Sequence, residues 1–189
     1  MFIKRSIILF FSIIIIFSCQ ENDKKEEINI SHEIAGLNSI SEKEKFLEKI
    51  YTADQGIRNG ESTELLHKYG KDSKELQEFY QKMISIDKLN LKRIDLYLNE
   101  FDYPDRESFS QKANSAPWLV IHHSTDIQTR NKYFKILREA YHGNAINSDQ
   151  FELYLGRTYQ MEFGKYPTQN GPYQPDDKIN RLIKELNLE

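Results

Sequence analysis

The longest regular pattern in the sequence is SKELQEFYQKMISIDKLNLKRIDLYLNEF, residues 73–101. Its apolar residues recur every three or four positions, which places them on one face of a helix. They are Leu76, Phe79, Tyr80, Met83, Ile84, Leu91, Ile94, Leu98 and Phe101. Ser73 can cap the N-terminus of this helix, and Tyr103-Pro104 ends the pattern. The stretch therefore predicts a long amphipathic helix.

Shorter helical patterns lie on both sides. Ser41-Glu42-Lys43-Glu44 is a capping-box pattern, so a helix is expected to begin there and to end at Asn59-Gly60. The apolar run Trp118–Ile121 fits a buried strand or a buried helix, and the absence of a neighbouring strand pattern favours the helix. Further helices are expected over residues 63–69, 133–143, 151–159 and 176–188, with one long loop over 164–175. Residues 41–189 are thus predicted to form one all-α, compact multi-helix domain.

A secretion signal precedes this domain. Lys4 and Arg5 are followed by an apolar run over residues 7–17, which is too short to span a membrane as a helix. The end of the run, Ile16-Phe17-Ser18-Cys19, resembles the lipobox of bacterial lipoproteins. That resemblance implies that residues 1–18 are removed as a signal peptide and that Cys19 is lipidated. Cleavage elsewhere, giving a plain secreted protein, is the alternative.

Residues 19–40 are rich in Glu, Asn, Lys, Asp and Ser, which predicts a flexible polar tether after the lipidated Cys19. The expected location is the cell envelope, on the outer membrane facing the periplasm or the surface, with the membrane as partner through Cys19. Since Cys19 is the only cysteine, neither a disulfide nor a Cys nucleophile is expected. The net charge is −3 with both signs interleaved, which argues against nucleic acid as a partner.

Several polar residues do not fit the helical core pattern. Asp54 and Arg58 are four positions apart and share a helix face, where they form either part of a site or only a surface ion pair. Asp87 and Asn90 are three apart and form either a site wall or a cap between two helices.

The pair His122-His123 ends the apolar run. Neighbouring helical residues point about 100° apart, so this pair alone does not predict a metal site. One of the two can act as a general base oriented by Asp126 or by a distant Asp, or it can be a buried histidine bonded to a carbonyl. Glycine-rich phosphate loops and the common metal and nucleophile motifs are absent from the sequence, so no cofactor and no metal are expected.

The order of these residues resembles a bacterial domain family of unknown function, which has D-Q-x-x-R, D-x-x-N, Q-H, D-R and Y-G-T-Q motifs. The chain has His122, Gly156 and Pro167 where the pattern has Gln, Asp and Gly, so it resembles a divergent member. The resemblance implies catalytic candidates His123 and Asp54. It also implies ligand-binding candidates Gln55, Arg58, Asp87, Asn90, Arg157, Thr168 and Gln169. The family supplies no reaction.

Two functions follow as hypotheses. In the first, these residues converge on a pocket between helices that binds a small polar or anionic ligand, with or without catalysis. In the second, the chain is a non-catalytic interaction protein of the envelope, immunity-like or structural. An exposed cluster of Tyr133, Tyr141, Tyr154 and Tyr159 would favour the second.

Overall fold

The computed structural model describes residues 24–168 and 174–188. These residues divide between two compact units, one ending at Asn38 and the other beginning at Ser39. In the first unit, residues 24–35 form a helix. The sequence analysis assigned these residues to an irregular tether, and the helix corrects that assignment. Glu and Lys, which made the stretch look like a solvated linker, are also good helix formers.

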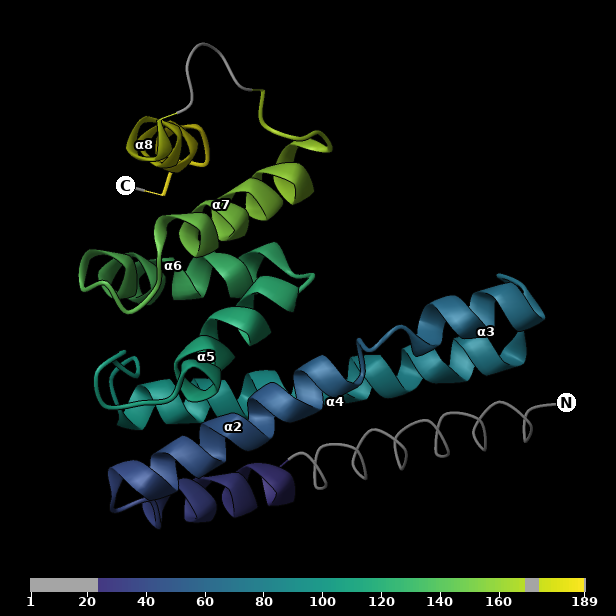
Figure 1. The fold of residues 1–189 in the computed structure, drawn as a ribbon, viewed down its shortest axis with the longest axis horizontal. Coiled ribbons are helices and arrows are strands. Elements are labelled where there is room, and N and C mark those ends of the chain that lie inside the picture. The colour runs from purple at the N-terminus through teal and green to yellow at the C-terminus, as the bar shows by residue number, and fades with distance from the viewer. Residues whose placement is uncertain (1–23, 169–173, 189) are drawn as a thin grey trace, which may run out of the picture. The chain divides into compact units, whose positions relative to one another are not determined.

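The second unit contains the helices α2 to α8, and the described residues contain no strand (Figure 1). The prediction of an all-α domain is therefore confirmed. Its first helix, α2 (Ile40–Gly56), begins two residues earlier than the predicted capping box indicates. The cap is Ser39, whose side chain accepts from the backbone N–H of Glu42, while Glu42 Oε2 accepts from the N–H of Ser39. Ser41 and Glu44 have the same spacing, but they lie inside the helix.

The long amphipathic pattern forms one continuous helix, α4 (Lys74–Glu100), and the prediction is confirmed. Ser73 caps it by accepting from the N–H of Leu76. The short helix α3 (Glu61–Tyr69) precedes α4 and packs against it. The buried face of α4 carries Leu76, Phe79, Asn90, Ile94 and Tyr97.

The ambiguous apolar run lies in α5 (Gln111–His123), so the helical interpretation is also confirmed. This helix contacts α2, α4, α6 and α7, and Figure 1 shows it between the α2–α4 pair and the later helices. Ser110 fixes its N-terminus to α2, donating from its N–H to Glu44 and from its hydroxyl to Glu48. Because α5 is central, its C-terminal histidines lie among several helices.

The chain continues through α6 (Ile127–His142), α7 (Ser148–Phe163) and α8 (Pro175–Glu185). The helix α7 packs against α5, α6 and α8. Trp118 of α5 donates from Nε1 to the backbone carbonyl of Gln150 in α7, at 2.8 Å. This contact holds the C-terminal half of α5 against α7.

Candidate functional site

A buried carboxylate near the C-terminus of α2 forms the centre of a polar network. The side chain of Asp54 is only 1% exposed. Its Oδ1 lies 3.0 Å from Nδ1 of His123 and 3.2 Å from Nη1 of Arg58. Its Oδ2 accepts from the side-chain amide of Gln55, at 2.8 Å. Three donors therefore hold both oxygens of this carboxylate.

The same network reaches α4 through Arg58. Its Nη2 lies 2.8 Å from both carboxylate oxygens of Asp87, while its Nη1 also donates to the backbone carbonyl of Asp54. The guanidinium is thus shared between two acidic side chains. It ties the end of α2 to the middle of α4, and its charge is balanced within the protein.

The surroundings of Asp54 keep it ionised. Burial alone would raise the pKa of this carboxyl group, but the hydrogen bond and charge of His123, together with Arg58 and Gln55, hold the pKa below its ordinary value. A carboxylate can only accept hydrogen bonds, so Nδ1 of His123 is the donor in this pair. The other ring nitrogen, Nε2, makes no hydrogen bond with any described residue.

Asn90 extends the polar face of α4 by one turn from Asp87. Its side chain is buried, and neither its amide nitrogen nor its amide oxygen has a hydrogen-bond partner among the described residues. Leaving such a group unpaired costs about 1–3 kcal/mol. The unpaired amide of Asn90 therefore destabilises the fold, which is typical of a buried polar residue that has a functional role.

His122 lines a cavity of about 760 Å³ whose wall contains none of the side chains of this network. Its ring stacks on Trp118, and its buried Nδ1 has no hydrogen-bond partner among the described residues. Burial, reinforced by the positive charges of Arg130 and Arg157, lowers the pKa of His122 to about 3. The imidazole is consequently neutral at physiological pH.

Arg157 of α7 lines the same cavity. It makes no hydrogen bond or ion pair with any described residue, and it interacts electrostatically with His122 and with the like charge of Arg130. Another cation of the cavity wall, Lys178, is bonded to Glu152. Of the cations that line this cavity, Arg157 is therefore the one that has no acidic partner among the described residues.

Arg130 is a structural centre that the sequence analysis missed. The side chain is fully buried. Its Nη1 donates to carbonyls at the end of α5, at 3.2 Å from Ile121 and 2.7 Å from His122, while Nη2 donates to Tyr154 at 2.7 Å. A cation suits the C-terminus of a helix, where carbonyls and the negative end of the dipole meet. Arg130 therefore fixes the helix end that carries both histidines.

The structure brings together five of the predicted residues: Asp54, Gln55, Arg58, Asp87 and His123. The distant Asp54 orients His123, whereas Asp126 caps α6 by accepting from the N–H of Thr129. Arg157 lies at the separate His122 cavity, so the two arginines do not face one ligand. Thr168 is exposed, and Gln169 falls outside the described residues.

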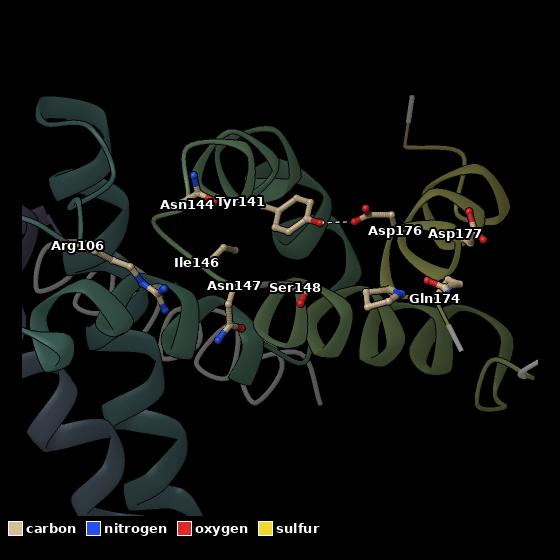
Figure 2. A pocket seen from close by; sticks show the side chains of 10 residues that line it. Arg106, Tyr141, Asn144, Ile146, Asn147, Ser148, Gln174, Asp176 and Asp177 are labelled. Carbon is tan, nitrogen blue, oxygen red and sulfur yellow. Dashed lines mark hydrogen bonds between the residues drawn. The ribbon is translucent and has the colours of Figure 1, made fainter. Parts of the chain in front are cut away.

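A second cavity, of about 590 Å³, lies at the N-termini of α7 and α8 (Figure 2). Figure 2 shows the Tyr141 hydroxyl directed at Asp176, to which it donates at 2.7 Å. Asp177 lies beside Asp176, and Arg106 is on the other side of the view. The wall contains none of the predicted site residues.

Comparison of the chain with protein-family models, curated proteins and solved structures gives no match. The resemblance to a family of unknown function therefore stays a prediction. Among the described residues, no group of three or more acidic, His or Cys side chains could hold a metal ion. In the same part of the chain, no helix has the length and apolar character needed to cross a membrane.

Proposed function

We propose that this chain is a lipid-anchored protein of the bacterial cell envelope that binds a small organic anion in the His122 cavity. The observation that carries the proposal is that the guanidinium of Arg157, in the wall of that cavity, has no hydrogen-bond or ion-pair partner among the described residues. Arginine presents several N–H donors in a planar fork that matches carboxylate and phosphate groups. An anion would therefore supply the missing counter-charge.

The other lining residues suggest the rest of the ligand. His122 is neutral and offers a ring nitrogen, and Gln160 offers an amide. Leu153, Met161 and Tyr166 contribute apolar surface, and both Leu153 and Tyr166 are exposed. An anion with an attached apolar group can use both kinds of surface. Simple aromatic carboxylates and phosphate esters belong to this class.

The charge of the second cavity makes it a weaker candidate for an anion. Two acidic residues, Asp176 and Asp177, line it against one cation, Arg106, and Asp176 already accepts a hydrogen bond from Tyr141. Like charges would repel a carboxylate or phosphate ligand there. The His122 cavity has one acidic lining residue, Glu152, which is bonded to Lys178.

The lipid anchor is proposed from the lipobox pattern that ends at Cys19. Residues 1–23 lie outside the described part of the chain, so this part of the proposal rests on sequence alone. Acylation at Cys19 would provide attachment without a membrane-spanning helix.

The alternative of a tyrosine-rich interaction face gains no support from the side-chain positions. Tyr133 and Tyr154 are buried, and Tyr154 donates from its hydroxyl to the carbonyl of Arg130. Tyr141 and Tyr159 are half-buried. The four tyrosines therefore do not form a shared exposed face.

Thermal-shift measurements on the full chain in detergent test the anion site, with benzoate, phenyl phosphate and inorganic phosphate as probes. A ligand present at about 100 times its Kd should raise the unfolding free energy by about 2.7 kcal/mol. Arg157→Gln should abolish the shift. Arg138→Gln, which changes an exposed arginine of α6, is the matched control and should keep it. Equal stabilisation of the wild type and Arg157→Gln would contradict the proposal.

A further inference from the structure

We propose that this protein hydrolyses small neutral esters, with His123 as the general base and Asp54 as its positioning residue. This activity goes beyond the proposed anion binding and uses a different set of side chains. It depends on Nε2 of His123, which makes no hydrogen bond with any described residue, and on the buried carboxylate of Asp54 that fixes Nδ1.

The orientation of the imidazole is well determined. Nδ1 of His123 donates to Oδ1 of Asp54 at 3.0 Å, and the carboxylate is held in turn by Arg58 and Gln55. Arg58 is itself fixed by both oxygens of Asp87. Each member of the network therefore restrains the next. This arrangement selects the tautomer in which Nε2 carries the lone pair, as a general base requires.

The ring of His123 is also partly accessible to solvent. The His123 side chain is 17% exposed, and Nε2 has no hydrogen-bond partner among the described residues. Its neighbour His122 is also half-buried, but it lines the cavity of Arg157, and its Nδ1 has no hydrogen-bond partner among the described residues. Of the two adjacent histidines, His123 is the one with both an orienting carboxylate and an open ring edge.

The charges of the network indicate the substrate class. With a neutral imidazole, Asp54, Asp87 and Arg58 together carry a formal charge of −1, from two carboxylates and one guanidinium. This charge disfavours an anionic substrate. It favours a transition state in which the imidazole becomes positive, because Asp54 lies beside it. A neutral ester attacked by water fits both conditions.

In the proposed reaction, Nε2 of His123 accepts a proton from water while the water oxygen forms a bond to the ester carbonyl carbon. The carbonyl π electrons move to its oxygen. When that electron pair returns, the C–O bond to the leaving group breaks, and His123 gives its proton to the departing alkoxide. The products are a carboxylic acid and an alcohol, and His123 is again neutral. Asp54 stays ionised throughout and stabilises the imidazolium.

Hydrolysis of p-nitrophenyl acetate by the full chain in detergent tests this proposal. General-base catalysis contributes about 100-fold or more to a rate, so His123→Gln should lower kcat by about that factor. The glutamine amide can still donate to Asp54, which protects the fold, but it cannot carry a proton. His142→Ala changes an exposed histidine and should keep the wild-type rate.

The role of Asp54 is tested by Asp54→Asn, which should lower kcat while leaving KM nearly unchanged. Added imidazole should restore part of the rate of a His123→Gly variant, a result that a purely structural histidine would not give. Two results would overturn the proposal: His123→Gln as fast as the wild type, or a wild type no faster than free imidazole at equal concentration. Anion binding is measured separately, by the thermal shift with benzoate and phenyl phosphate, so failure of the esterase assay is distinct from failure of anion binding.

Discussion

The carboxylate of Asp54 and the imidazole of His123, 69 positions apart in the sequence, meet at 3.0 Å across the contact between α2 and α5. Asp54→Ala would leave the donors of His123, Arg58 and Gln55 without their acceptor. Losing hydrogen bonds to a buried charged group costs about 2 kcal/mol or more. We expect that loss in the unfolding free energy, measured by urea denaturation.

Asp102→Ala is the matched control for this change, because Asp102 is exposed. It should alter the unfolding free energy by less than about 0.5 kcal/mol. If Asp54→Ala were no more destabilising than Asp102→Ala, the network would not contribute to stability.

The lowered pKa of Asp54 also predicts an acid dependence. The unfolded carboxyl has the ordinary value near 3.8, and the folded one lies below it. Between these values the unfolded state binds more protons, so stability falls as pH falls. The contribution of Asp54 is fully present above the unfolded value and is lost below the folded one. Urea midpoints from pH 5 to pH 2 should therefore fall less steeply for Asp54→Asn than for the wild type.

His122 predicts a second and separate pH dependence. Its pKa falls from an ordinary value of 6.5 to about 3 in the folded protein. Between these two pH values the unfolded state binds a proton at His122 that the folded state does not bind. The free energy of unfolding therefore decreases as pH falls from 6.5 towards 3. The limiting slope is about 1.4 kcal/mol per pH unit for one group. Urea midpoints across this range measure the slope.

His122→Gln removes the titrating ring and places the residue of the resembled family pattern at this position. It should flatten the stability profile between pH 6.5 and 4. His142→Gln, at an exposed histidine, is the control and should leave the profile unchanged. A His122→Gln profile as steep as that of the wild type would show that His122 is not the buried neutral histidine described above.

Asn90 gives a prediction of the opposite sign. Because both polar atoms of its amide are buried without a partner in the described chain, Asn90→Leu removes an unfavourable group while keeping the branching and the number of heavy atoms of the side chain. Thermal unfolding should show unchanged or increased stability, by up to about 1 kcal/mol. A loss of 2 kcal/mol or more would mean that the amide is satisfied in the folded protein.

The lipid anchor has its own test. In cells that carry out lipoprotein modification, the wild type should incorporate a palmitate analogue and sediment with membranes. Cys19→Ser should do neither, because the thiol is the proposed site of diacylglycerol attachment. Ser18→Ala keeps a small residue before the cysteine and should retain labelling. Labelling of Cys19→Ser would refute lipidation at this position.

Local patterns predicted most of the helical structure. The periodic apolar residues of α4 and the serine cap at Ser73 depend only on neighbours in sequence, and both are present in the structure. The cap of α2 was misplaced because Ser39 and Ser41 are each followed by a glutamate three positions later, and local pattern alone does not rank them. The helix over residues 24–35 was missed for a similar reason, since charged residues suit both linkers and helices.

The candidate site was less predictable because its contacts are distant in sequence. Spacing of four indicated the Asp54–Arg58 pair, but no local feature indicates that Asp54 accepts from His123 or that Asp87 binds Arg58. No sequence pattern distinguishes Arg130 from the other polar residues of its helix. It looks like an ordinary polar helical residue until its buried position shows that it binds the carbonyls at the end of α5.

The central claim is that Arg157 binds an organic anion, and calorimetric titration tests it most directly. Phenyl phosphate and benzoate would be titrated into the wild type, Arg157→Gln and Arg138→Gln, each as the full chain in detergent. The account predicts saturable 1:1 binding of at least one of these anions by the wild type and Arg138→Gln. It predicts an affinity at least about tenfold weaker for Arg157→Gln, from the loss of a charge-assisted hydrogen bond. Equal affinity in all three proteins, or no binding by the wild type, would contradict it.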